Sequence, residues 1–129
     1  MTIQEALHLY LTDVDDLVAL VPSSSISWID ARQTKTYPRV TYKQISAPPL
    51  YDAPDQWQRW RFYAYHMDKS RCLDIATALH DCLHRFSGDM AGIYISYISL
   101  IDRFDPEYQE TQQVYEAALD FRICFTGGQ

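Results

Sequence analysis

The chain has 129 residues and a formal net charge of −6, and 47% of its residues are hydrophobic and 22% charged. This length suits one compact domain, and this composition excludes a disordered or collagen-like chain. The acidic balance argues against nucleic-acid binding, because proteins that bind DNA gather Lys and Arg against its phosphates.

The N-terminal part of the sequence predicts two helical segments. Apolar residues recur at helical spacing from Ile3 to Val14, which gives one stripe that can be buried. Thr12 is predicted to cap a second short helical turn, because Asp15 stands three residues later and apolar residues follow. Pro22 and the serines after it are predicted to end this turn.

Short strands are predicted next. Residues 26–30 form a brief β-type run, and residues 31–38 are polar and end in a proline, which is typical of a loop or a ragged sheet edge. Residues 39–46 alternate, with Val40 and Tyr42 on one face, and predict a half-buried strand.

Residues 47–56 are predicted to form a docking loop. The segment contains Pro48, Pro49 and Pro54, and proline supplies no backbone donor to a strand ladder. Leu50 and Tyr51 lie between these prolines and are the side chains that we expect to contact a partner.

A strand is predicted at residues 57–66, because the sequence alternates again. Trp60, Phe62 and Ala64 share one face, which is predicted to be core. The opposite face carries Arg59, Arg61, Tyr63 and Tyr65. These side chains suit either stacking on the bases of a single strand or contact with a protein, and the acidic total favours a protein interface.

The C-terminal half predicts one long helix and two strands. Asp68 or Ser70 can cap a helix whose apolar stripe runs from Cys72 to Phe86, and Gly88 is predicted to supply its left-handed stop. Residues 93–103 and 114–125 predict an antiparallel pair of strands. The polar stretch between them, residues 104–113, is expected to be a long connection that reaches neighbouring subunits.

The order of these segments predicts an α+β fold, an antiparallel β-sheet with two main helices packed on one face. We expect a single domain over residues 1–126 and a flexible C-terminal tail at residues 127–129. Ten Tyr and three Trp are many for this length, and such amphipathic rings suit surfaces that are buried against a partner. The composition therefore predicts an oligomer.

No predicted site has the pattern of a metal centre. His80 and His84 lie one helical turn apart and could share a metal with Asp81 or Cys82, but a further ligand is needed and no HExxH motif is present. A solvated or interfacial helix face explains them better. The acidic run at residues 13–16 lacks the glycine and the terminal glutamate of a calcium loop and is explained by helix capping.

Catalytic chemistry is likewise not predicted. Cys72, Cys82 and Cys124 are odd in number and lack CxxC spacing, so neither a disulfide framework nor a zinc ribbon is predicted, and the cysteines fit a reducing cytosol. The sequence has no GxSxG motif, Walker loop or dinucleotide fingerprint. The N-terminal residues carry no basic leader or long apolar run, so we expect no secretory signal and no membrane span. We expect no cofactor and no enzyme activity.

The order of motifs resembles that of phage tail-completion (tail-terminator, head–tail joining) proteins. Their opening is similar to LVALVP at residues 17–22 and to YPRVTY at residues 37–42. The resemblance continues through the strand at 60–66, the helix at 68–86 and the closing segment at 105–123, and so covers nearly the whole chain. The proline-rich loop and the strongly aromatic strand that follows it depart from the family pattern.

The resemblance implies a ring-forming subunit, usually of a hexamer, that caps the tail tube and then joins it to the head connector. Its partners would be other copies of itself, the tail tube protein and head–tail connector proteins, without sequence-specific nucleic-acid binding or a membrane. It would assemble in the host cytoplasm and end in the tail or neck of the virion. Expected interface residues are Leu50, Tyr51, Arg59, Arg61, Tyr63 and Tyr108. A head-closure or neck protein and a small ligand-binding regulatory module are the alternatives.

Overall fold

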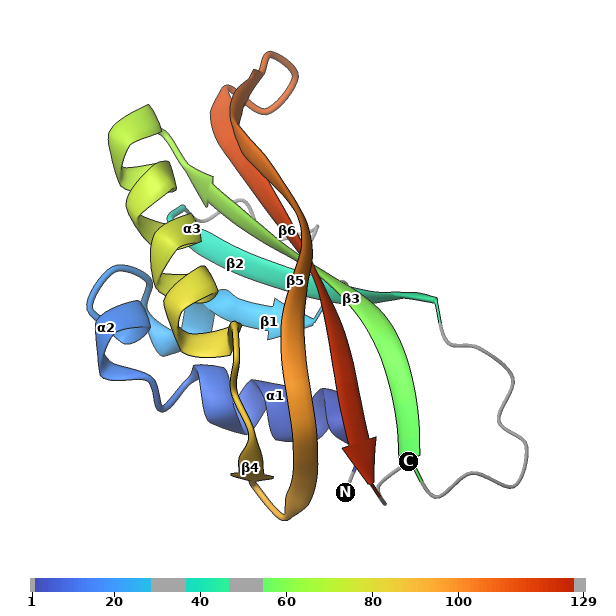
Figure 1. The fold of residues 1–129 in the computed structure, drawn as a ribbon. Helices are drawn as coiled ribbons and strands as arrows, with labels where there is room; N and C mark the ends of the chain where they lie inside the picture. Colours follow the sequence, from blue (N-terminus) through green and yellow to red (C-terminus); the bar gives the residue numbers. More distant parts are fainter. Residues whose placement is uncertain (1, 29–36, 47–54, 127–129) are drawn as a thin grey trace.

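The computed structural model describes residues 2–28, 37–46 and 55–126. Within these ranges the chain forms one sheet with its α-helices gathered on one face (Figure 1). The predicted α+β class and the helices on one face are therefore confirmed. The elements in chain order are α1 (Ile3–Leu11), α2 (Asp15–Val18), a 3₁₀ turn (Ser23–Ser25), β1 (Ile26–Trp28), β2 (Arg39–Ser46), β3 (Asp55–His66), α3 (Lys69–Leu83), β4 (Gly88–Met90), β5 (Ile93–Gln109) and β6 (Val114–Thr126).

The described strands form a 6-stranded sheet in the order β1-β2-β3-β6-β5-β4. All neighbouring strands are antiparallel except β1 and β2, which are parallel. The expectation of an antiparallel sheet thus fails at one edge. The sequence pattern could not show this, because alternation of polar and apolar residues reports which face is buried and not the direction of the neighbouring strand.

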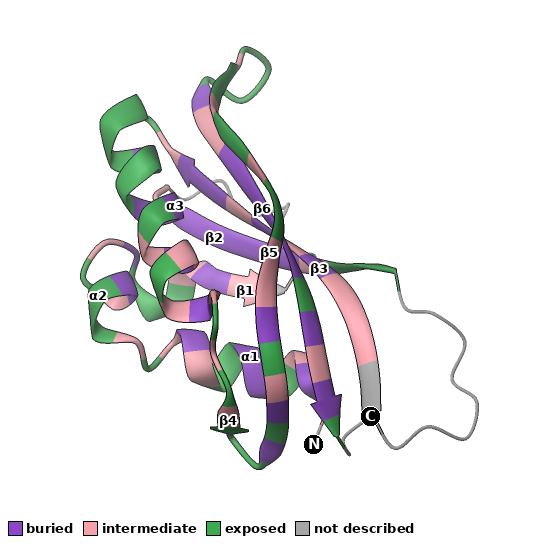
Figure 2. Cartoon of the chain, viewed as in Figure 1, coloured by how far each residue is buried: buried purple, intermediate pink, exposed green. Residues whose placement is uncertain are grey.

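The core lies between the helices and the sheet, and buried positions alternate along the central strands (Figure 2). Trp60 and Phe62 of β3 face the helices, as predicted, and Phe62 packs edge-on against Phe121 of β6 at 5.7 Å between ring centroids. The apolar stripe predicted for α3 is also confirmed. Its fully buried members are Cys72, Ile75, Ala76, Leu79 and Leu83. Each large apolar side chain buried in this way stabilises the fold by about 1.5–3 kcal/mol.

Helix α1 begins with a capping box that the sequence analysis did not identify. The Thr2 hydroxyl accepts from the Glu5 backbone amide at 3.1 Å, and the Thr2 amide donates to the Glu5 carboxylate at 2.9 Å. The predicted capping role of Thr12 is wrong. Thr12 has a helical backbone at the end of α1, and its hydroxyl donates to the His8 carbonyl at 2.8 Å. Helix α2 starts after Val14 without a side-chain cap.

The end of α3 also differs from its prediction. The helix stops at Leu83, and the first residue with a positive φ after it is Arg85, with φ of 69°, whereas Gly88, with φ of 121°, already begins β4. The Arg85 amide donates to the Ile98 carbonyl of β5 at 2.7 Å, and the Ile98 amide donates to the Phe86 carbonyl at 3.1 Å. Pairing with β5 therefore draws the chain out of the helix before the glycine is reached.

Strand β4 was not predicted. It pairs with the start of β5 through a tight turn at Ala91 and Gly92, whose φ angles are 50° and 98°. A turn with positive φ at both central residues is the hairpin type that glycine favours, so Ala91–Gly92 is the signal that could have revealed it.

Residues 104–113 do not form the predicted long connection. Strand β5 is 17 residues long and continues to Gln109, so only a tight turn joins it to β6. The register shifts between Phe104 and Glu107, and this irregularity accommodates Pro106, which cannot donate to a ladder. We call residues 104–113 the arm. It projects from one end of the molecule (Figure 1), and its residues are mostly exposed.

Candidate functional site

The sheet face opposite the helices is the first candidate surface, and we call it the open face. No helix or strand among the described residues covers it (Figure 1). The alternation of β3 places Arg59, Arg61 and Tyr63 there, as predicted, because Trp60 and Phe62 point into the core. Charged and aromatic members of the open face include Arg39, Lys43, Trp57, Arg59, Arg61, Tyr63, Tyr65, Tyr94, Tyr97, Asp102, Phe104, Glu107, Glu116, Asp120 and Arg122.

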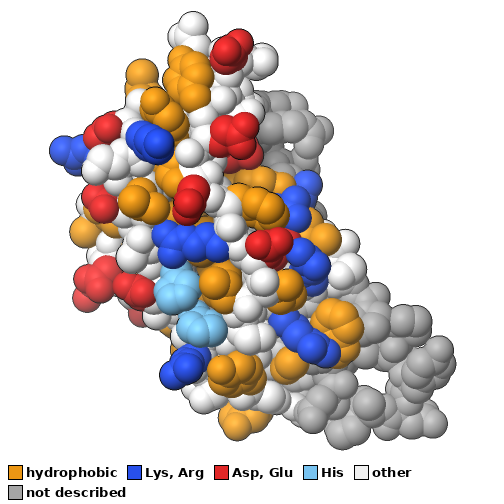
Figure 3. Space-filling model, turned by 45° about the horizontal axis from the view of Figure 1, so that its top comes forward, with side chains coloured by type: hydrophobic (Ala, Val, Ile, Leu, Met, Phe, Trp, Pro, Cys, Tyr) orange, Lys and Arg blue, Asp and Glu red, His pale blue; other side chains and the backbone are white. Residues whose placement is uncertain are grey.

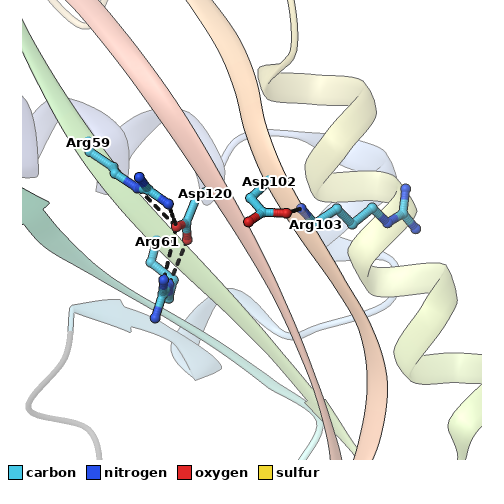
Figure 4. Close-up of polar contacts among 5 residues, drawn as sticks. All are labelled: Arg59, Arg61, Asp102, Arg103 and Asp120. Carbon is cyan, nitrogen blue, oxygen red and sulfur yellow. Dashed lines mark hydrogen bonds and ion pairs between the residues drawn. The ribbon is translucent and has the colours of Figure 1, made fainter.

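Asp120 joins the two arginines at the centre of the open face (Figure 4). Its carboxylate accepts from Arg59 Nε at 3.0 Å and from Arg61 at 2.6 and 3.0 Å. The Asp120 side chain is fully buried, whereas the two arginine side chains are 32% and 30% exposed. Burial opposes ionisation, but the hydrogen bonds from Arg61 and Arg59 outweigh it and hold the pKa of Asp120 below its ordinary value.

Cations and aromatic rings alternate over the rest of the open face. Arg122 lies 4.3 Å from the centre of the Trp57 ring, and Lys43 lies 5.7 Å from that of Tyr63. Arg61 also stands over Phe104, at 5.6 Å, and so connects the central ion pair to the base of the arm. Arginine and tyrosine are the side chains that most often carry binding energy in protein interfaces. The residue types of the open face are therefore typical of a protein interface.

The arm is the second candidate surface. Phe104 is 46% exposed and Tyr108 is 47% exposed, and Ile101 just before the arm is 43% exposed. In Figure 3, hydrophobic side chains lie at the surface in the upper part of the molecule, where the arm projects, with acidic side chains beside them. Exposed apolar groups gathered on one projecting hairpin are typical of an interaction site.

The predicted interface residues fall into three places. Arg59, Arg61 and Tyr63 are brought together on the open face. Tyr108 lies apart from them on the arm, where its ring meets Tyr115 edge-on at 5.2 Å. Leu50 and Tyr51 belong to residues 47–54, which are outside the described residues.

Three important side chains were not singled out from the sequence. Phe104 was assigned to the predicted connection, and Ile101 was assigned to the strand before it. Asp120 was not recognised as a partner of the arginines. In the last predicted strand, Asp120 lies between the inward Leu119 and Phe121 and so must face outward. An acidic residue at an outward strand position was the feature of the sequence that could have indicated its role. Its pairing with Arg61 follows only from the register of β3 and β6.

Among the hollows that the described residues line, three lie near the candidate surfaces or the helices. One of about 550 Å³ lies between the start of α3 and the arm, and its lining is Asp68, Lys69, Ser70, Leu73, Asp105 and Pro106. Another, of about 260 Å³, lies on the open face at the base of the arm and is lined by Arg61, Tyr63, Phe104, Asp105, Glu107, Gln109, Glu116 and Ala118. A third, of about 310 Å³, lies between α2 and α3 and is lined by Val14, Asp16, Leu20, Asp74, Thr77, Ala78, Asp81 and Cys82.

The histidines and cysteines fit structural roles. His80 and His84 stack at 5.0 Å, but Nδ1 of His84 accepts from the Leu100 amide at 3.2 Å. Within the described ranges no group of three His, Cys, Asp or Glu side chains is placed to hold a metal. Burial raises the pKa of Cys72 to about 11 and that of Cys82 to about 12, so both thiols are protonated at neutral pH. A protonated, buried thiol is a poor nucleophile.

Comparison with known proteins gives a structural likeness. No known family model matches the chain, and no curated protein matches it. A chain of a solved structure described as "Virion of native gene transfer agent (GTA) particle" matches with a TM-score of 0.78 and 13% sequence identity. The match covers 98% of this chain and 96% of that chain. The two chains therefore share one fold over almost their whole lengths. In the part of the chain that the structure describes, no helix combines the length and hydrophobicity needed to cross a bilayer.

Proposed function

We propose that this protein is a structural subunit of a phage-like virion. The observation that carries this proposal is the fold shared, over 98% of the chain, with a protein chain of a gene transfer agent particle. The cations and rings of the open face and the exposed apolar side chains of the arm support it, because these residue types are typical of protein interfaces.

Within such a particle, the role we propose is tail completion. Residues 1–126 form one assembly domain, several copies of which, usually six in the family that the sequence resembles, make a ring. This ring caps the tail tube and joins it to the head connector. The resemblance of the sequence motifs to tail-completion proteins supports this finer role. The protein would be made in the host cytoplasm and would remain in the virion.

The arm has the properties that a ring contact requires. A hairpin built on the long strands β5 and β6 is held by the sheet at its base and projects at its tip. Its apolar side chains, Phe104 and Tyr108, are half exposed in the single chain and would be buried against a neighbouring subunit or the tube. Binding through a preformed hairpin costs less conformational entropy than ordering a loop.

A test begins with the mass of the purified full chain, measured by light scattering, and with images of the particles in negative stain. We expect rings whose mass is a small integer multiple of 15.1 kDa. Binding to purified tail tube protein and to connector proteins is then measured separately. Binding to the tube distinguishes a tail-completion protein from a head-closure or neck protein, which would bind only the connector.

The arm is tested with the double variant Phe104→Ser and Tyr108→Ser. We expect weaker ring formation or weaker tube binding, with the fold intact by thermal unfolding. The control is Leu9→Ser, which removes an apolar side chain that is 49% exposed on α1, away from the arm and the open face. A chain that stays monomeric and binds neither tube nor connector would contradict the proposed function.

A further inference from the structure

We infer that the open face of one copy binds the helix side of the next copy, at the groove between α2 and α3. This rests on the proposed function, since it assigns the surfaces through which a ring would form. The groove is the hollow of about 310 Å³ described above, and we call it the acidic groove. The partner is a second copy of this chain, and the contact is head-to-tail.

The two surfaces carry opposite charge. Lys43 and Arg122 stand on the open face in addition to the arginines that Asp120 binds, and they are spread over β2, β3 and β6. Asp16, Asp74 and Asp81 line the acidic groove, and the nearby Arg103 guanidinium donates to Thr77 of the lining at 3.3 Å. The other lining residues are Val14, Leu20, Ala78 and Cys82. Surfaces with complementary potentials attract each other and fix the register of an interface.

The net charge of the chain affects how two copies approach each other. At −6 overall, copies of the chain repel one another on average, and Lys43 and Arg122 give the open face cations that can offset this repulsion. Asp13 and Asp15, which precede and begin α2 and are exposed, add negative charge beside Asp16 of the groove. A second copy is therefore attracted most strongly when its helix side meets the open face of the first.

The two surfaces lie on opposite sides of the molecule, so the contact between them can be repeated from copy to copy. The helices lie on one side of the sheet and the basic residues on the other, so each copy can bind one neighbour on each side (Figure 1). A contact that joins two different surfaces is heterologous, and its repetition closes into a ring when the rotation between copies allows it. Such a contact cannot stop at a two-fold dimer.

Single-stranded nucleic acid is the other partner that a basic, aromatic face could bind. The net charge of −6 disfavours it, because proteins that bind nucleic acids gather Lys and Arg against the phosphates. We therefore assign the face to a protein partner and include nucleic acid in the test.

The test uses two charge-reversal variants of the full chain. Variant A carries Lys43→Glu and Arg122→Glu, which makes the open face acidic. Variant B carries Asp74→Lys and Asp81→Lys, which makes the groove basic. All four side chains lie at the surface, and none belongs to the buried ion pair of Asp120. Thermal unfolding of each variant verifies that it is folded.

Alone, each variant would bring like charges together at every contact. We expect the apparent dissociation constant for assembly, measured by light scattering over a concentration series, to rise at least about 10-fold for A and for B. An equal mixture of A and B would restore assembly, because the acidic open face of A fits the basic groove of B and the unaltered surfaces also match. Copies would then alternate around the ring.

The control carries Arg85→Glu, one charge reversal at an exposed position after α3 that lies outside the open face, the groove lining and the arm, and it is compared with Lys43→Glu alone. It should assemble like the unaltered chain. Raising the salt concentration should weaken assembly of the unaltered chain, since exposed charges are screened over about 10 Å at 0.1 M.

Each outcome is decisive. Rings that form equally well from A and from B, or a mixture that fails to assemble, would refute this contact while leaving the proposed ring function in place. An unaltered chain that never assembles would reject both. Binding of an oligothymidine to the unaltered chain that variant A loses, with assembly unaffected by A, would show that the open face binds nucleic acid instead.

Discussion

Asn in place of Asp120 is expected to destabilise the fold substantially. Asp120 is fully buried and is the shared partner of Arg59 and Arg61 on the open face. Removing one partner from a buried ion pair costs about 3–5 kcal/mol. Both arginines are about one-third exposed, so water partly solvates them after the change, and we discount the expected loss to roughly 2–3 kcal/mol.

This loss is measured by urea unfolding and by thermal unfolding of Asp120→Asn at pH 7. For a domain of this length, roughly 2–3 kcal/mol corresponds to a fall in melting temperature of about 7–11 °C. Asp102→Asn is the matched control. Asp102 is the register partner of Asp120 on β5, but it is exposed and is bonded to the Arg103 backbone amide. Its replacement should change stability by less than about 0.5 kcal/mol.

The effect of Asp120 also depends on pH. Its folded pKa lies below its unfolded value, so its ionised form stabilises the folded state above the ordinary pKa of about 3.9. That contribution is lost as the pH falls through the folded pKa. The difference between Asp120→Asn and the unaltered chain should therefore shrink below about pH 4. If Asp120→Asn unfolds within about 0.5 kcal/mol of the unaltered chain at pH 7, the reasoning on this ion pair is wrong.

Three further changes test other parts of the fold. The Tyr42 hydroxyl is buried without a hydrogen-bond partner among the described residues, so Tyr42→Phe should leave the melting temperature unchanged or raise it, and a clear fall would reveal a missed partner. Thr2→Ala removes the capping box of α1 and should cost about 1 kcal/mol in urea unfolding, whereas no loss would mean that the first turn frays. At pH 8 the Cys72 and Cys82 thiols, with pKa values raised to about 11 and about 12, should react with iodoacetamide much more slowly in the folded chain than in urea, as followed by mass spectrometry, and equal rates would contradict these raised pKa values.

Much of the fold could be predicted from the sequence, because burial on one face imposes a local period. The alternation of β2 and β3 identified both strands and assigned Trp60 and Phe62 to the core. The helical stripe of α3 was identified for the same reason. The same alternation predicted that the basic and aromatic residues of β3 share the face opposite the core, since successive residues of a strand point to opposite faces.

The sequence predicted less well where long-range pairing overrides local preference. Pro106 indicated a loop, but pairing with β6 keeps residues 104–109 in a strand, and a register shift accommodates the proline. Gly88 indicated the end of a helix, but hydrogen bonds to Ile98 end α3 earlier at Leu83. In each case contacts distant in the sequence outweighed a single residue's preference.

By itself, then, the sequence determined which side chains of β3 leave the core, because a period of two is a property of the local backbone. Only the tertiary structure decided what they meet. Arg61 and Asp120 are 59 positions apart and become partners through the register of β3 and β6. The separation of the basic open face from the acidic groove was also decided by the fold, because it depends on which side of the sheet the helices cover.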